Sequence, residues 1–226
     1  LEYAIQNDFD YVATGHYALI EKLGSRWGLK RSPAAKDQSY VLYRLSQEQL
    51  SRTLTPLGNL EKAQARKLAE EAGLAVAHKP DSQDICFIPD GDYNRYIARV
   101  TGKEPEPGDF VGLDGKILGK HQGITRYTIG QRKGLGISFG EPMYVTKIDP
   151  LSNQVTLGPE GSQYAKGLLA GDVNWVSIAP PSAPFSAQVK VRYQAPPSPA
   201  LITPLTDGRV KIEFEHPQRS VTPGQA

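Results

Sequence analysis

The sequence has few of the features that mark secreted or membrane proteins. It contains one cysteine, Cys86, so it cannot form an internal disulfide, which fits a reducing, cytoplasmic setting. No stretch approaches the roughly 20 consecutive apolar residues of a membrane helix. Residues 1–5 show neither the basic region nor the apolar core of a signal peptide. We therefore expect a cytoplasmic protein without membrane contact.

The chain also has little net charge, +2 over 226 residues, which does not by itself indicate a nucleic-acid binder. With 39% hydrophobic and 22% charged residues it has the composition of a globular protein of one large or two to three small domains. The local distribution is less even, because residues 116–133 contain five basic side chains and no acidic one. These five are Lys116, Lys120, Arg126, Arg132 and Lys133. From charge alone a solvated face is the commoner interpretation of such a run, and phosphate contact is the other.

The first hundred residues show the pattern of an α/β fold. Residues 1–7 predict a helix that feeds a short buried strand at 11–14, and residues 19–20 and 27–30 predict a hairpin that turns at Gly24 and Ser25. Ser46 and Gln49 form a capping-box pattern at the start of a further helix. Two more helices are expected, over 60–72 with Asn59 as cap and over 93–100 with Asp92 as cap.

After Thr101 the sequence predicts short strands between turn residues and no convincing helix. The expected strands are 144–148, 154–157, 173–176, 188–193 and 209–214. This spacing is typical of a barrel or a sandwich. The fold class is therefore α/β, followed by mostly β modules.

Cys86 is the first candidate for chemistry. A lone cysteine in an apolar quartet is more often a small buried core residue than a nucleophile. The polar loop before it places Cys86 at a boundary instead, where His78 and Lys79 could stabilise a thiolate. Asp81 and Asp84 would oppose that effect, so the residues alone leave both interpretations open.

Three other segments combine residue types that could bind a ligand. Thr14, Gly15 and His16 end the first strand, where ligands bind in α/β sheets, although a simple turn is an equal alternative. Residues 36–39 could meet a phosphate or a base edge, and a helix-cap role is commoner. Residues 126–134 interleave basic, aromatic and glycine residues, which can neutralise phosphates and stack on bases. One cysteine and four scattered histidines give no zinc pattern, and no metal ligand is predicted.

Six segments taken in order resemble the bacterial tRNA-specific 2-thiouridylases. They are residues 13–17 (ATGHY), 36–40 (KDQSY), 81–88 (DSQDICFI), 121–123 (HQG), 128–136 (TIGQRKGLG) and 221–225 (VTPGQ). Each is weak alone, but the ordered set covers essentially the whole chain. The resemblance implies a Rossmann-type, adenine-nucleotide-hydrolase-like domain, a small central domain and an antiparallel β-barrel. It implies that residues 1–92 are the C-terminal part of the ATP-pyrophosphatase catalytic domain, 93–142 the central tRNA-binding domain and 143–226 a truncated barrel.

The resemblance also implies an activity and the residues that carry it. The family converts the wobble uridine of tRNAs for lysine, glutamate and glutamine to 2-thiouridine: ATP with Mg²⁺ adenylates the uracil oxygen, and a cysteine persulfide supplies the sulfur. Cys86 matches the cysteine that receives the persulfide from a sulfur-donor protein, and Gly15 matches an ATP contact. The matched tRNA contacts are His16, Lys36, Asp37, Gln38, Arg192, Tyr193 and Gln225. Alternation along the expected strand 188–193 places Lys190 and Arg192 together on an exposed face.

Two family features are missing from these 226 residues: the loop that grips the ATP pyrophosphate and the first catalytic cysteine. We expect both to lie upstream of Leu1 and the chain alone to be inactive. Two other functions stay open. One is a non-catalytic RNA-binding module, and the other is a cysteine hydrolase that pairs Cys86 with His16 or His78.

Overall fold

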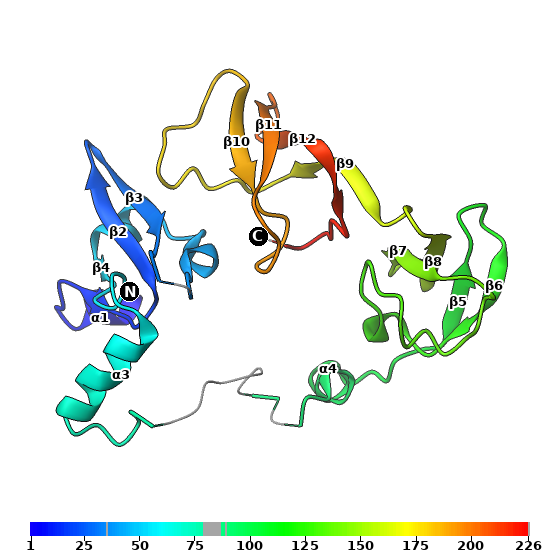
Figure 1. The fold of residues 1–226 in the computed structure, drawn as a ribbon, viewed down its shortest axis with the longest axis horizontal. Helices are drawn as coiled ribbons and strands as arrows, with labels where there is room; N and C mark the ends of the chain where they lie inside the picture. Colours follow the sequence, from blue (N-terminus) through cyan, green and yellow to red (C-terminus); the bar gives the residue numbers. More distant parts are fainter. Residues whose placement is uncertain (35, 79–86, 89, 226) are drawn as a thin grey trace.

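The fold is known from a computed structural model that describes residues 1–34, 36–78, 87–88 and 90–225. Cys86, and with it the predicted persulfide position, lies outside these described residues. The chain forms an α/β part, a first β module and a second β module (Figure 1). The second module lies between the other two, and the C-terminal end of the chain reaches into the space between them.

The α/β part contains two small sheets. Strand β1 (Val12–Ala13) pairs in parallel with β4 (Thr53–Leu54), after helix α1 (Glu2–Gln6). Strands β2 (Ala18–Leu23) and β3 (Arg26–Arg31) form the predicted antiparallel hairpin, with Gly24 in the turn at φ +62°. The first strand is shorter than predicted and only half-buried, since β4 is its one neighbour among the strands described.

Among the helices of this part, α2 begins at a side-chain cap, whereas α1 has Leu1 as its N-cap and no side-chain cap hydrogen bond. The predicted capping box is present at α2 (Gln47–Ser51), where Ser46 Oγ accepts a hydrogen bond from the Gln49 N–H at 3.2 Å. A 3₁₀ turn, η1 (Ser39–Leu42), precedes this helix. The predicted cap of α3 (Lys62–Glu71) was wrong, because Glu61 rather than Asn59 is the N-cap.

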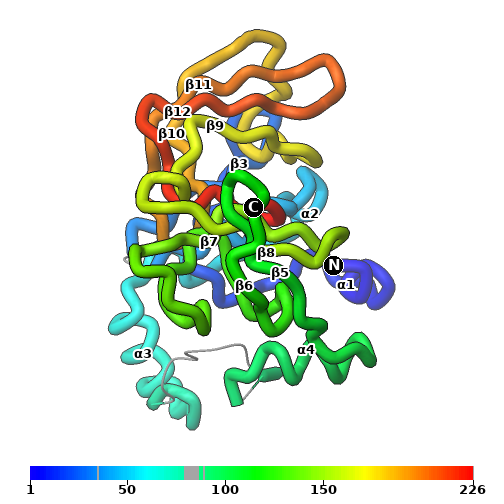
Figure 2. Tube along the Cα trace, turned by 90° about the vertical axis from the view of Figure 1, so that its right-hand side faces the viewer, coloured from blue at the N-terminus to red at the C-terminus, as the bar shows by residue number. Residues whose placement is uncertain are grey.

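Helix α4 (Tyr93–Thr101) follows the sequence prediction closely. Asp92 caps it by accepting a hydrogen bond from the Arg95 N–H at 3.0 Å, and Gly102 ends it at φ +68°. Figure 2 shows α3 and α4 on the same lower side of the molecule. The only helical turn described beyond α4 is the 3₁₀ segment η2 (Ile124–Arg126).

The first β module is a mixed sheet in the order β6-β5-β8-β7. Its strands are β5 (Gly108–Val111), β6 (Ile117–His121), β7 (Met143–Asp149) and β8 (Gln154–Pro159). Phe110, Val145, Val155 and Leu157 are fully buried and form its core. Because β5 pairs in parallel with β8, this sheet continues across the expected boundary between residues 142 and 143. We therefore propose a second domain boundary after Pro159, at the end of β8.

The second β module is an antiparallel sheet in the order β10-β11-β12-β9. Its strands are β9 (Tyr164–Ala170), β10 (Phe185–Val189), β11 (Ser198–Pro204) and β12 (Val210–Arg219). Residues 173–176 are not a strand, and β10 ends at Val189 rather than Tyr193, so both predictions were wrong. In the part of the chain that is described, the strands form open sheets and not a closed barrel. The fold class, partial α/β followed by β modules, is confirmed.

His121 of the HQG segment holds the first β module together from inside. Its side chain is 1% exposed; Nδ1 accepts a hydrogen bond from the Gly123 N–H at 3.0 Å, and Nε2 donates to Asn153 O at 3.1 Å. The ring also contacts Phe110 edge-on at 5.5 Å. The histidine therefore has a structural role that its sequence context did not indicate.

We expect His121→Ala to lower the free energy of unfolding by about 2–4 kcal/mol, because it removes a packed ring and leaves buried hydrogen-bonding groups unpaired. Urea unfolding of the full-length protein, followed by circular dichroism, measures this change. The matched control is Lys116→Ala, whose ion pair with Asp114 is exposed and should contribute less than about 1 kcal/mol. Equal losses in the two variants would contradict the structural role.

Candidate functional site

The end of β1 forms a compact turn. Thr14 continues the pairing with β4 through its N–H, which donates to Leu54 O at 2.9 Å. The Thr14 hydroxyl and His16 Nδ1 are hydrogen-bonded at 2.8 Å, so His16 is held close to the turn and is half-buried. A Cβ added to Gly15 would meet only Leu57 Cδ1, at 3.7 Å. Gly15 is exposed but does not line a tight cradle.

The described residues do not fit ATP or Mg²⁺ by themselves. An anion site needs converging N–H groups or cations, and a magnesium site needs several oxygen ligands. Nothing packs closely over Gly15, and the described ranges contain no group of three or more His, Cys, Asp or Glu side chains that could hold a metal ion. The ATP contact of Gly15 therefore stays a prediction.

The 36–40 loop is shaped by two of its own polar side chains. Asp37 Oδ1 accepts hydrogen bonds from the N–H groups of Ser32 at 2.9 Å and Ser39 at 3.2 Å, and its carboxylate also lies 3.5 Å from Arg31 Nε. Gln38 Oε1 accepts from the Tyr17 N–H at 3.0 Å. These contacts shape the loop, but Gln38, the N-cap of η1, makes no side-chain cap hydrogen bond. Lys36 is the exposed cation of the three predicted contacts.

Two backbone hydrogen bonds join the 128–134 loop to β7. The Gly130 N–H donates to Val145 O at 2.7 Å, and the Val145 N–H donates to Gln131 O at 2.9 Å. Within the loop, Gln131 accepts from the Thr128 N–H at 3.0 Å and donates to Lys133 O at 3.0 Å. The loop therefore has a defined shape, and it leaves Arg132 and Lys133 exposed.

A charged cluster adjoins this loop. The Tyr144 hydroxyl donates a hydrogen bond to the Glu160 carboxylate, which raises the pKa of Tyr144 and lowers the pKa of Glu160. Gln163 Nε2 donates to the same carboxylate at 2.9 Å, and the charges of Arg219 and Arg132 lower the pKa of Glu160 further. Glu160 is thus kept ionised between two cations that come from different modules.

The structure brings three of the sequence segments, 36–40, 128–134 and 221–225, together around residues 190–193. The Arg192 guanidinium donates to Ile129 O in the 128–134 loop at 3.0 Å and to Thr222 Oγ1 in the 221–225 segment. The Tyr193 hydroxyl donates to Asp37 O in the 36–40 loop at 3.2 Å, and the Tyr193 and Tyr40 rings lie 5.8 Å apart. Gln225 is exposed at the end of the described chain. His16 lies at the end of β1, where its Nδ1 is hydrogen-bonded to the Thr14 hydroxyl.

A second set of hydrogen bonds joins the α/β part to residues 174–176, within the segment 173–176 that was wrongly predicted as a strand. Asn174 Nδ2 donates to Tyr43 O at 2.7 Å and Leu45 O at 3.0 Å. Arg26 donates to Trp175 O at 2.7 Å, and Gln47 donates to Val176 O at 2.8 Å. Polar side chains inside the apolar run 173–178 signal these contacts weakly in the sequence, but they do not identify the partners.

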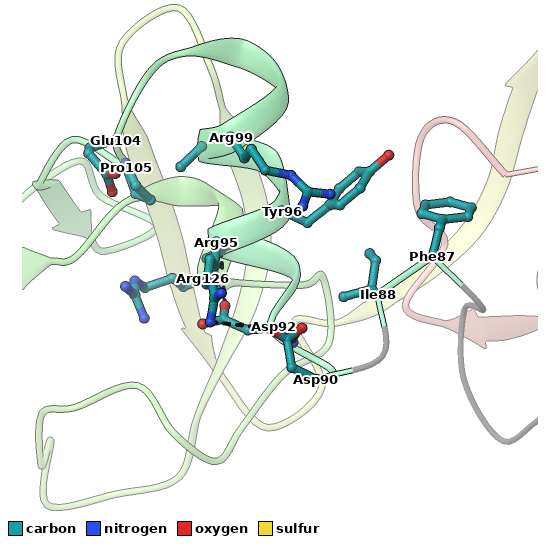
Figure 3. A pocket seen from close by; sticks show the side chains of 12 residues that line it. Phe87, Ile88, Asp90, Asp92, Arg95, Tyr96, Arg99, Glu104, Pro105 and Arg126 are labelled. Carbon is teal, nitrogen blue, oxygen red and sulfur yellow. Dashed lines mark hydrogen bonds and ion pairs between the residues drawn. The ribbon is translucent and has the colours of Figure 1, made fainter.

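One cavity of about 610 Å³ lies between residues 87–88, helix α4 and Arg126, directly after the Cys86 segment in the chain (Figure 3). The Phe87 and Tyr96 rings lie 5.2 Å apart on one side, and the Arg99 guanidinium lies 5.2 Å above the Tyr96 ring. Its three lining arginines are balanced by three carboxylates, so net charge does not favour an anion there.

No helix in the described ranges is long and apolar enough to cross a bilayer.

Comparison with known protein families places this arrangement in a class. Residues 1–90 match the tRNA methyl transferase HUP domain, 94–159 the tRNA methyl transferase PRC-barrel domain, and 165–226 the aminomethyltransferase beta-barrel domain. The α/β part and the two β modules of the fold agree, in this order, with the three matched domains. The middle match ends at the last residue of β8, which supports the proposed boundary after Pro159.

The curated relatives are more specific than these domain descriptions. The chain is 51% identical to the tRNA-specific 2-thiouridylase MnmA of Acetivibrio thermocellus over 229 residues, which cover 100% of this chain and 64% of that protein. It is 51% identical to the enzyme of Clostridioides difficile, with 96% and 61% covered, and 46% identical to that of Halothermothrix orenii, with 100% and 64% covered. The chain belongs to the tRNA-specific 2-thiouridylase family. It spans less than two thirds of the length of these relatives.

Proposed function

We propose that the full-length protein replaces the 2-oxygen of the wobble uridine in tRNA with sulfur. The observation that carries this proposal is the 51% identity, over the whole chain, to a relative named a tRNA-specific 2-thiouridylase. The domain descriptions name methyl transfer instead, but they match short modules, whereas the relatives match all of the chain. The tRNAs for lysine, glutamate and glutamine are the proposed substrates, on the family resemblance.

The convergence of loops supports a tRNA surface. Lys36, Arg132 and Lys133 come from two modules that the 190–193 turn ties together, and all three are exposed. Exposed cations spread across a surface neutralise phosphates of one backbone, and this term dominates the affinity of proteins for nucleic acids. We propose the predicted tRNA contacts for this surface, with Lys36 as a phosphate contact and with Asp37 and Gln38 shaping the loop that carries it.

The chemistry requires more groups than the chain supplies. We propose that ATP, with Mg²⁺, adenylates the uracil oxygen and releases pyrophosphate, and that the terminal sulfur of a Cys86 persulfide then attacks C2, so that AMP leaves with that oxygen. The S–S bond of the persulfide must also break, which requires a second thiolate that forms a disulfide with Cys86. Cys86 is the only cysteine of these residues, so the second thiol comes from elsewhere. A thiol reductant of the cytoplasm then reduces this disulfide to two thiols, and a sulfur-donor protein transfers a persulfide sulfur to Cys86 again.

The test uses the protein expressed from its complete reading frame, with unmodified tRNA, ATP and a persulfide donor. We expect one sulfur per tRNA at the wobble uridine, detected as 2-thiouridine after nuclease digestion, and no product without ATP. A protein that binds tRNA tightly but leaves every uridine unmodified would instead be the non-catalytic RNA-binding module. A sulfur-modified nucleoside at another position would refute the proposed site of modification.

A further inference from the structure

We propose that Gln163 is a positioning residue that fixes the hinge between the two β modules and so aligns their exposed residues along one tRNA. The chain passes directly from the end of β8 at Pro159 to the start of β9 at Tyr164, so residues 160–163 form this hinge. The inference rests on the proposed function, because tRNA is the ligand that both modules would bind. The tRNA contacts proposed for the second module keep that role; they are Arg192, Tyr193 and Gln225.

The Gln163 amide is buried, and both of its ends are hydrogen-bonded. The residue is 4% exposed. Its Oε1 accepts a hydrogen bond from the Gly161 N–H at 2.9 Å, and its Nε2 donates to Glu160 Oε1 at 2.9 Å. Breaking either bond would leave a buried polar group unpaired, which costs more than the bond itself contributes. The side chain therefore holds two of the other hinge residues in one conformation.

The same residue connects the hinge to both modules. On the side of the second module, the Gln163 main-chain O accepts a hydrogen bond from the N–H of Ser220, the residue after β12, at 2.7 Å. On the side of the first module, Glu160 accepts a hydrogen bond from the hydroxyl of Tyr144, which lies in β7 and is 3% exposed. Gln163 and Glu160 thus form one hydrogen-bonded path from β7 to the end of β12.

The backbone around the hinge is closely packed as well. A Cβ added to Gly158 would lie 2.6 Å from Ser162 Cβ, and one added to Gly130 would lie 1.8 Å from Ser220 Oγ. Ser220 has φ +55°, which is uncommon for a serine and persists only where the surroundings hold it. The two modules therefore meet in close contact here, and the hinge is not a flexible linker.

The hinge lies beside exposed cations that come from different modules. Arg132 belongs to the 128–134 loop, Arg219 ends β12, and both interact electrostatically with the Glu160 carboxylate. The Arg219 guanidinium lies 5.9 Å from the centre of the Tyr144 ring. Cations of two modules contact the phosphates of one RNA most favourably when the modules are already fixed, because ordering a free hinge on binding reduces affinity.

Exchanging the two hydrogen-bonding side chains tests the hinge in the full-length protein. Gln163→Glu replaces the Nε2 donor by a carboxylate oxygen that faces Glu160, so the hydrogen bond is replaced by repulsion. We expect tRNA affinity to fall by about 5- to 50-fold, and the amides of Gly161 and Ser220 to exchange faster without RNA. Adding Glu160→Gln reverses donor and acceptor at the wild-type net charge, so the double variant should recover most of the affinity and the slow exchange.

Three controls separate this role from charge and from stability. Glu160→Gln alone keeps an oxygen that can accept from Gln163 Nε2, so it should lose less affinity than Gln163→Glu. Lys133→Ala removes a proposed phosphate contact; it should lower the slope of log K against log salt by roughly 0.7–0.9 and leave exchange at Gly161 and Ser220 unchanged. Urea unfolding of each variant, followed by circular dichroism, confirms that affinity is measured on folded protein.

The result that overturns the proposal is a Gln163→Glu variant that binds tRNA as the wild type does, or a double variant that recovers neither affinity nor slow exchange. If the wild-type protein binds no tRNA, the proposed function fails. The exchange of the Gly161 and Ser220 amides in the single and double variants then still decides whether Gln163 fixes the hinge.

Discussion

Cys86→Ser is expected to reduce sulfur incorporation into tRNA by on the order of a thousandfold or more and to leave tRNA affinity unchanged. Serine is nearly the same size as cysteine but cannot carry a persulfide, so the step that delivers sulfur is lost. Radiolabelled persulfide sulfur supplied to the full-length protein, with unmodified tRNA, measures the transfer, and a filter-binding titration measures the affinity.

The cysteine-hydrolase alternative makes a different prediction, which a histidine variant tests. That alternative needs His16 or His78 as the base for Cys86, yet the structure holds His16 Nδ1 at Thr14 and His78 Nδ1 3.6 Å from Glu70. We expect His78→Ala to retain sulfur transfer, because the His78 side chain is 83% exposed and lies beside Glu70. Sulfur incorporation that survives Cys86→Ser would refute the role of the cysteine, and hydrolysis of activated esters by the wild type that needs His78 would favour the hydrolase.

Local sequence signals predicted the helices and the hairpin well. The elements that were missed or predicted wrongly depend on contacts between segments distant in the chain. The Ser46 and Asp92 caps could be predicted because each side chain hydrogen-bonds a backbone N–H within three residues. Strand β11 was missed, because Pro199 and Pro204 indicate a loop, whereas both lie near the ends of the strand, where a lost N–H costs little. Residues 173–176 have strand-like composition, but they hydrogen-bond to the α/β part instead. Asn174 Nδ2, for example, donates to Tyr43 O and Leu45 O.

In the candidate site, too, the sequence indicates which residues are candidates but not which residues they contact. The sequence identified the segments 36–40, 128–134 and 221–225 as candidates, together with Arg192. It could not show that the Arg192 guanidinium joins two of these segments, because its partners are one backbone oxygen 63 residues away and one threonine hydroxyl 30 residues away. The expected alternation along 188–193 failed for a local reason: β10 ends at Val189, and Arg192 lies in the turn that follows.

Phe110→Ala should produce the largest loss of stability, about 3–5 kcal/mol of the free energy of unfolding. The Phe110 side chain is fully buried, and its ring meets His121 at 5.5 Å, Tyr127 at 5.1 Å and Phe139 at 6.3 Å in edge-on contacts. Removing it leaves a cavity that these rings cannot refill without leaving their own contacts. Because domains are stable by only about 5–15 kcal/mol, this loss is a large fraction of the total.

The same substitution should also weaken tRNA binding, because the core supports the loop that carries the exposed cations. Strand β5 holds Phe110 and pairs with β8, β8 pairs with β7, and Val145 of β7 clips the 128–134 loop. Urea unfolding and a tRNA titration at a temperature where the variant is still folded measure the two effects. Phe9→Ala is the matched control, since the same atoms are lost from a side chain that is 57% exposed, and it should cost less than about 1 kcal/mol. A Phe110→Ala protein that unfolds earlier yet binds tRNA as the wild type does would show that the loop keeps its shape without the core beneath it.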